Sequence, residues 1–140
     1  MEQKKVKVLI IDDSALMRKF LTDILSQSGE IEILGTAIDA NIAAKKINTL
    51  NPDVITLDIE MPGMDGLTFL QKLMIANPVP AIMVSSLTEK GSTAAIRALE
   101  IGAFDVIAKP QFDSNDSTSE FSRELIEKVV GAGNSKARIK

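Results

Sequence analysis

The 140-residue chain contains neither cysteine nor histidine. The absence of cysteine excludes disulfides, thiolate metal sites and cysteine nucleophiles, which fits a reducing cytoplasm. The absence of histidine excludes a Ser-His-Asp triad and any acid–base chemistry by imidazole. Chemistry in this chain therefore depends on carboxylates, hydroxyls and amines.

Long apolar runs and an excess of positive charge are also missing. No run approaches the roughly 20 residues of a membrane-spanning helix, and the N-terminus lacks the apolar core of a signal peptide. The net charge of −3 disfavours nucleic acid as a partner. With 45% hydrophobic and 25% charged residues, the composition predicts one globular domain with a substantial core, cytoplasmic and not inserted in a membrane.

Short apolar runs alternate along the chain with stretches of helical periodicity. The runs at 6–11, 31–38, 54–57, 81–84 and 104–108 are typical of strands buried on both faces. Helices are predicted between Ser14 and Gly29, and at 40–50, 67–76 and 92–101. The alternation predicts an α/β fold in which a five-stranded parallel sheet carries helices on both faces.

The C-terminal part has a different composition. A polar, turn-rich stretch at 111–119 precedes an amphipathic segment that predicts a last helix at about 118–130, which completes a domain over residues 1–130. Residues 131–140 are small and basic, and we expect a flexible terminus or the start of an interdomain linker.

Four of the predicted strands end in residues suited to cations or phosphate. Because the carboxyl ends of parallel strands share one edge of a sheet, where ligands bind in doubly wound folds, these residues are expected to meet. They are Asp12 and Asp13 after the first strand, Asp58 after the third, Ser85 after the fourth and Lys109 after the fifth.

The residue types at this edge predict magnesium and phosphoryl chemistry. Asp12, Asp13 and Asp58 offer the oxygen ligands that Mg²⁺ prefers, and a cation relieves their mutual repulsion. An aspartate carboxylate such as Asp58 can also attack a phosphoryl group and form an aspartyl phosphate. The Ser85 hydroxyl and the Lys109 ammonium are suitable donors to phosphate oxygens.

Each of these residues also has a simpler interpretation. The acidic pair can merely cap the following helix, because aspartate is a favoured capping residue. Asp58 and Lys109 can be solvated side chains at strand ends, and Ser85 a turn serine. Their occurrence in order on successive strands favours a shared site.

These motifs resemble the response-regulator receiver domain of two-component signalling, over residues 6–110. The resemblance implies a flavodoxin-like doubly wound sheet with strand order 2-1-3-4-5. The positions that carry it are Asp12-Asp13-Ser14, residues 58–66, Ser85 and Lys109-Pro110.

The resemblance also implies a role for each residue. Asp58 would accept a phosphoryl group from the phosphohistidine of a chemotaxis-type histidine kinase, and Ser85 and Lys109 would contact that group. Magnesium would be held by Asp12, Asp13, Asp58 and the backbone carbonyl of Glu60. Two further features complete the implied site: Met61 and Pro62 shape the loop after Asp58, and Pro110 follows a cis peptide bond, although X-Pro bonds alone favour trans.

Three segments resemble more closely the receiver half of the chemotaxis protein-glutamate methylesterase family: residues 12–18, 57–62 and 84–92. In that family the receiver regulates an attached esterase domain that acts on chemoreceptors. This chain is too short for an esterase domain and has no histidine, so none of the catalytic esterase residues is expected in it. It is interpreted as an isolated regulatory domain.

Other functions remain open at this point. The receiver can be a stand-alone module or belong to a regulator with another output, such as DNA binding. A magnesium phosphatase needs a second aspartate two residues after its nucleophile, where this chain has Ser14 or Glu60. A nucleotide-binding fold lacks its G-x-x-x-x-G-K or G-x-G-x-x-G motif.

One position departs from the receiver pattern. Receivers commonly carry an aromatic residue three positions before the lysine, and its ring moves inward on activation. Here that position is Val106, while Phe104 lies two residues earlier. Either Phe104 takes over this role or signalling relies on Ser85 and loop movement.

Overall fold

A single five-stranded parallel sheet organises the chain. The computed structural model describes residues 4–86, 92–110 and 115–138. The strand order β2-β1-β3-β4-β5 confirms the predicted flavodoxin-like topology. In chain order the elements are β1 (Val6–Ile11), α1 (Ala15–Ser26), β2 (Ile31–Ala37), α2 (Ala40–Leu50), β3 (Val54–Asp58), α3 (Gly66–Ala76), β4 (Ala81–Ser85), α4 (Thr93–Ile101), β5 (Asp105–Ala108) and α5 (Asn115–Arg138).

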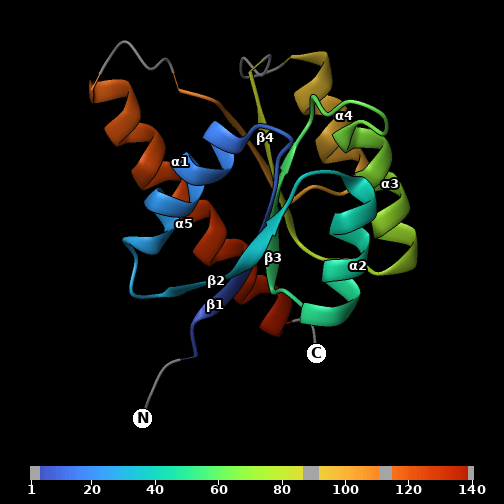
Figure 1. The fold of residues 1–140 in the computed structure, drawn as a ribbon, viewed down its shortest axis with the longest axis horizontal. Coiled ribbons are helices and arrows are strands. Elements are labelled where there is room, and N and C mark those ends of the chain that lie inside the picture. Colours follow the sequence, from blue (N-terminus) through green and yellow to red (C-terminus); the bar gives the residue numbers. More distant parts are fainter. Residues whose placement is uncertain (1–3, 87–91, 111–114, 139–140) are drawn as a thin grey trace.

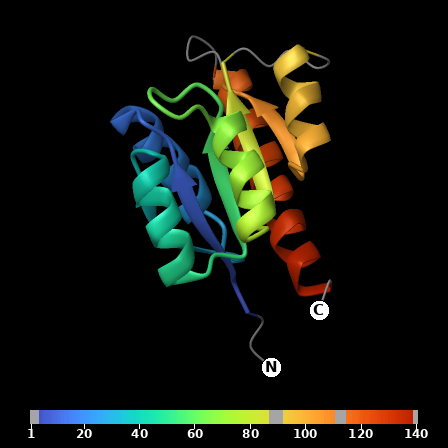
Figure 2. The same ribbon diagram turned by 90° about the vertical axis from the view of Figure 1, so that its right-hand side faces the viewer.

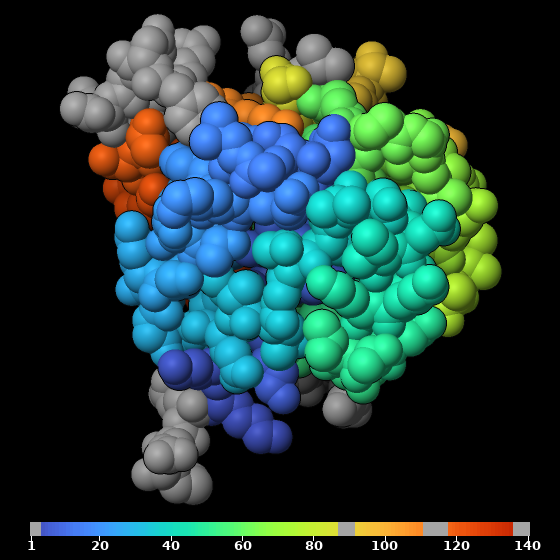
Figure 3. Space-filling view, in the orientation of Figure 1, coloured from blue at the N-terminus to red at the C-terminus, as the bar shows by residue number. Residues whose placement is uncertain are grey.

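Helices cover both faces of the sheet. Helices α1 and α5 lie on one face and α2, α3 and α4 on the other (Figures 1 and 2). Alternate residues of β1 therefore enter different cores: Val8 and Ile10 pack with α1 and α5, whereas Leu9 and Ile11 pack on the opposite face. Burial on both faces explains why the central strands are continuous apolar runs rather than alternating ones. In the space-filling view, residues of α1, β2 and α2 together form the surface on the β2 side of the sheet (Figure 3).

Side chains cap the first four helices. Ser14, Asp39, Asp65 and Ser92 each accept a hydrogen bond from the backbone N–H three residues later, which satisfies a donor that the helix itself leaves unpaired. The predicted cap at Ser14 is confirmed. The predicted stop at Gly29 is wrong by one short turn: α1 ends at Ser26, and the N–H of Gln27 closes it on the carbonyls of Ile24 and Leu25.

Helix α5 extends beyond the predicted end at residue 130. It continues to Arg138, so the predicted helix end at residue 130 is wrong, while the assignment of residues 131–140 to the start of an interdomain linker stays a prediction. Residues 111–114, 139 and 140 lie outside the described part. Ala132 is fully buried, and Gly133 approaches the Val6 side chain of β1 so closely that a Cβ at 133 would lie 2.3 Å from Val6 Cγ1. The small residues therefore allow the helix to pack on β1. Among the described residues, no helix is both long and apolar enough to cross a bilayer.

The two glycines of α5 test this packing. We expect Gly133→Ala to lower the free energy of unfolding by about 1–3 kcal/mol, because the new methyl group overlaps Val6. Gly131→Ala should raise it by up to about 1 kcal/mol, since its Cβ meets nothing within 4 Å and alanine has the higher helix propensity. Urea denaturation of the two variants measures both values. A stabilising Gly133→Ala would contradict the packing of α5 on β1.

Candidate functional site

The register of the sheet brings the predicted site residues to one edge. Ile11 of β1 pairs with Leu57 of β3, so Asp12 and Asp58 lie next to each other where these strands end. Asp58 in turn pairs with Val84, and Ser85 with Ala108. Ser85 and Lys109, which directly follows β5, therefore lie beyond Asp58 along the same edge of the sheet.

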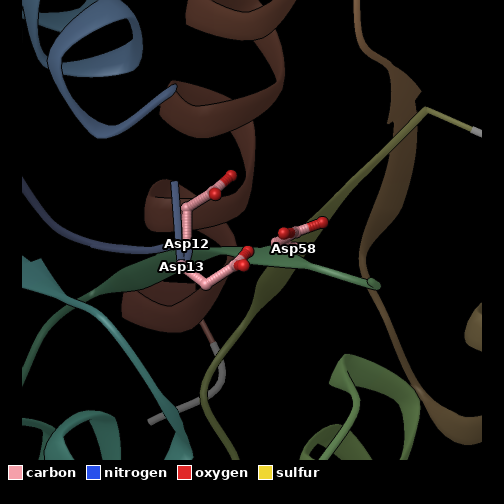
Figure 4. A group of neighbouring side chains, drawn as sticks. All are labelled: Asp12, Asp13 and Asp58. Atoms are coloured by element: carbon pink, nitrogen blue, oxygen red, sulfur yellow. The ribbon is translucent and has the colours of Figure 1, made fainter. Parts of the chain in front are cut away.

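Three carboxylates gather between β1 and β3 (Figure 4). Oxygens of Asp12, Asp13 and Asp58 lie within 4.8 Å of one another. Asp12 and Asp58 are 0% and 1% exposed, respectively, while Asp13 is exposed. Because Ser14 caps α1, the interpretation of the acidic pair as the helix cap is wrong. The pair is available for a ligand.

The surroundings of Asp12 fit the binding of a cation. Its Oδ1 accepts a hydrogen bond from the Ser14 N–H at 2.9 Å, and the Arg18 guanidinium donates to its backbone carbonyl at 2.9 Å. Its Oδ2, in contrast, is buried and has no hydrogen-bond partner among the described residues. A buried carboxylate oxygen without a donor is costly, and a divalent cation among these oxygens would satisfy it.

Burial and crowding change the acidity of the cluster. Burial raises the pKa of Asp12. The pKa of Asp58 rises to about 7, because of burial and the neighbouring charge of Asp12, against the opposing charge of Lys109. With a pKa of about 7, the Asp58 carboxyl is divided between its protonated and ionised forms near neutral pH, and a bound cation would favour the ionised form.

The loop after Asp58 follows the backbone of β3 closely. The Gly66 N–H donates to the Ile59 carbonyl at 2.9 Å, and a Cβ at position 66 would lie 2.2 Å from the Asp58 carbonyl oxygen. Only glycine permits this approach. Met61 is buried and Pro62 exposed. The peptide N–H of Glu60 donates to Asp58 Oδ1 at 3.1 Å, so this loop orients the Asp58 carboxylate directly.

The ends of β4 and β5 complete the site. Lys109 Nζ lies 3.5 Å from Asp58 Oδ1, and its side chain is only 18% exposed; its interpretation as a solvated lysine is wrong. Ser85 is fully buried, and its hydroxyl donates to the Glu60 carboxylate in a short hydrogen bond, so it is not a solvated turn serine. Residues 87–91 of the motif at 84–92 lie outside the described part.

One expectation drawn from the receiver pattern is wrong. The described residues contain no cis peptide bond, so the bond before Pro110 is not cis as expected but has the trans form that X-Pro bonds intrinsically favour. Phe104 is 44% exposed, and its role on activation stays a prediction. Val106 is partly buried and packs against the core formed with α2, α3 and α4.

Known proteins resemble this chain in both fold and sequence. The profile of the family described as the response regulator receiver domain matches residues 8–119, which is most of the chain. The chain belongs to this family. The structure of the response regulator domain of Thermotoga maritima CheB is similar, with a TM-score of 0.85 and 42% identity, over 94% of this chain and 98% of that one. This chain is therefore a receiver of the CheB type.

Full-length relatives are longer than this receiver. It is 50% identical over 138 residues to a protein-glutamate methylesterase/protein-glutamine glutaminase of Geobacter metallireducens, covering 99% of this chain and 38% of the relative. The corresponding protein of Nitrosomonas europaea is 53% identical over 136 residues, covering 97% of this chain and 37% of the relative. The receiver thus spans little more than a third of the length of these relatives.

Three contacts of the receiver site escaped the sequence analysis. Glu60 was considered only for its backbone carbonyl, yet its side chain binds Ser85 and Ser86. The contact of Arg18 with the Asp12 carbonyl was not foreseen either. The sequence signal was a carboxylate two residues after Asp58 and a Ser-Ser pair at the end of β4. Only the strand register shows that they meet.

The raised pKa of Asp58 predicts a dependence of stability on pH. The folded pKa of about 7 lies above the ordinary value of 3.8, so the carboxyl binds a proton more tightly in the folded domain. The contribution of Asp58 to the free energy of unfolding is therefore fully favourable below about pH 4 and is lost as the pH rises through about 7. We expect Asp58→Asn to stabilise the metal-free domain by more than about 1 kcal/mol at about pH 8, since one pKa unit corresponds to about 1.4 kcal/mol.

Urea denaturation with a chelator at about pH 4 and pH 8 measures this effect. Glu32→Gln removes an exposed carboxylate from β2 and serves as the matched control. Equal effects of Asp58→Asn at both pH values would contradict the assignment.

Proposed function

We propose that Asp58 is the phosphoacceptor of this receiver and takes a phosphoryl group from the phosphohistidine of a histidine kinase. A carboxylate oxygen of Asp58 attacks phosphorus, an O–P bond forms, and the N–P bond breaks with its electron pair left on the imidazole. The observation that carries the proposal is the convergence on buried Asp58 of two carboxylates and one ammonium, at distances within 4.8 Å and 3.5 Å. An isolated structural aspartate would not need these neighbours.

The acidic cluster fits a magnesium ion. Asp12, Asp13 and Asp58, with the backbone carbonyl of Glu60, would hold it, and the orphaned Oδ2 of Asp12 supports this assignment. When bound, Mg²⁺ offsets negative charge on the transferring oxygens. Arg18 and Ser14 hold Asp12 in place through its backbone carbonyl and Oδ1, and the Glu60 N–H orients Asp58.

Ser85 and Lys109 are the residues proposed to detect phosphorylation. A phosphoryl group adds about 1.5 to 2 negative charges and three acceptor oxygens. The Lys109 ammonium already lies beside Asp58, and Ser85 is the last residue of the neighbouring strand β4. Movement of these two donors toward the new group would carry the change to β4, β5 and the adjoining helices.

The relatives support a regulatory role in a larger protein. Two of them are protein-glutamate methylesterase/protein-glutamine glutaminases more than twice as long as this receiver. We therefore propose that the native protein continues into a methylesterase domain that acts on chemoreceptors in the cytoplasm. Residues beyond the end of α5 would begin the connection. Phosphorylation of Asp58 would regulate that domain.

Phosphorylation can be tested with a small phosphodonor. With acetyl phosphate and Mg²⁺, the wild-type receiver should gain the mass of one phosphoryl group, and a chelator should prevent the gain. Asp58→Asn should show none, because an amide is not a nucleophile of this kind. Asp23→Asn changes an exposed carboxylate of α1 and should behave as wild type. Intact-protein mass spectrometry gives the answer; a persistent gain in Asp58→Asn would sink the assignment.

The proposed regulation of an esterase domain can be tested on the longer gene product. If the reading frame continues into an esterase domain, its hydrolysis of chemoreceptor methyl esters should respond to acetyl phosphate in the wild type and not in Asp58→Asn. A reading frame that ends near Lys140, or continues into a DNA-binding domain, would contradict the methylesterase assignment and leave the phosphoacceptor role intact.

A further inference from the structure

The Glu60 carboxylate accepts hydrogen bonds from several donors that converge on it. Its Oε2 accepts a short hydrogen bond from the Ser85 hydroxyl. Its Oε1 accepts one from the Ser86 backbone N–H at 3.0 Å and one from the Ser86 hydroxyl at 2.6 Å. Two hydroxyls and a peptide N–H directed at one carboxylate form a small anion-binding site at the end of β4.

Lys109 adds positive charge to the same place. Burial alone would raise the pKa of Glu60, but the hydrogen bonds from Ser85 and Ser86 and the charge of Lys109 hold it below the usual value. The Lys109 ammonium is also 3.5 Å from Asp58 Oδ1. The donors around Glu60 therefore adjoin the carboxylate that is proposed to become phosphorylated.

We propose that Glu60 is an internal competitor of the phosphoryl group: its carboxylate holds Ser85 and Ser86 while Asp58 is unmodified, and it must release them when Asp58 is phosphorylated. This inference rests on the proposed function, which assigns Ser85 and Lys109 to the phosphoryl group. The two anions cannot share these donors, because a phosphorylated Asp58 and Glu60 would bring like charges together in a partly buried site.

The position of Glu60 makes this exchange feasible. Its peptide N–H is bound to Asp58 Oδ1, so the backbone can stay in place while the side chain turns. Glu60 is only partly buried and Ser86 is exposed, so the released carboxylate can reach water. Phosphorylation would then separate the loop after β3 from the end of β4, two segments that the Glu60 side chain now joins.

A purely structural role for Glu60 predicts a different outcome. If Glu60 only braces the loop, its removal lowers stability and leaves the affinity for an anion at Asp58 equal or weaker. If it competes, its removal strengthens that affinity. Beryllium fluoride with Mg²⁺ is a suitable probe, because it forms a tetrahedral group on a carboxylate without a covalent transfer.

The experiment compares wild type, Glu60→Ala, Glu60→Gln and Glu32→Gln by amide NMR. Without beryllium fluoride, the Ser86 amide resonance should move in both Glu60 variants and stay in the Glu32→Gln control. In the titration, Glu60→Ala should reach half-saturation at a concentration about tenfold lower than wild type, the size expected from losing hydrogen bonds to a charged group. Glu60→Gln keeps an acceptor oxygen without the charge and should fall between them.

The outcomes separate this inference from the proposed function. If both Glu60 variants bind beryllium fluoride but reach half-saturation at the same concentration as wild type or a higher one, the competition is overturned and the phosphoacceptor role stands. An unmoved Ser86 amide in the ligand-free Glu60→Ala variant would show that the contact is absent in solution, which also overturns it. Failure of every chain to bind the probe, wild type included, would instead overturn the proposed function and the competition together. Glu60→Gln keeps the test valid if Glu60→Ala does not fold.

Discussion

The crowding of Asp12 and Asp58 at the buried end of the sheet is the interaction on which the rest of the site depends. Both side chains are almost completely removed from water, and Asp13 lies beside them. The burial and repulsion that raise the pKa of Asp58 are unfavourable for the isolated domain. In the proposed function, the same burial and repulsion would favour a bound cation and phosphoryl chemistry at Asp58 rather than at its neighbours.

Backbone geometry maintains this crowded arrangement. The N–H groups of Ser14 and Glu60 bind Asp12 and Asp58, and Gly66 allows the loop after β3 to lie against the strand. Around this acidic centre, Lys109 connects β5 to β3 and Glu60 connects the β3 loop to the end of β4. A change of charge at Asp58, as proposed, would therefore act on two neighbouring strand ends through these contacts, although position 106 carries valine rather than an aromatic ring.

The secondary structure was predictable wherever the local pattern of apolar residues matches their burial in the fold. The central strands are apolar throughout because both of their faces are buried, and α2 begins and ends at the predicted residues. The end of α5 was not predictable in this way. Small residues at 131–133 are typical of a linker in sequence, but here they permit close contact with Val6. The cis bond expected before Pro110 was a property of the resemblance rather than of the residues, and the bond is trans.

The sequence by itself determined the order of the elements, the edge of the sheet at which the candidate site lies, and the identity of its residues Asp12, Asp13, Asp58, Ser85 and Lys109. These follow from local patterns, because a buried strand and the polar residue after it are neighbours in the chain. Only the tertiary structure decided that Glu60 holds Ser85 and Ser86 and that one oxygen of Asp12 has no donor in the part of the chain that the structure describes. Those facts depend on the register between strands and on side-chain directions across them, which no local pattern encodes.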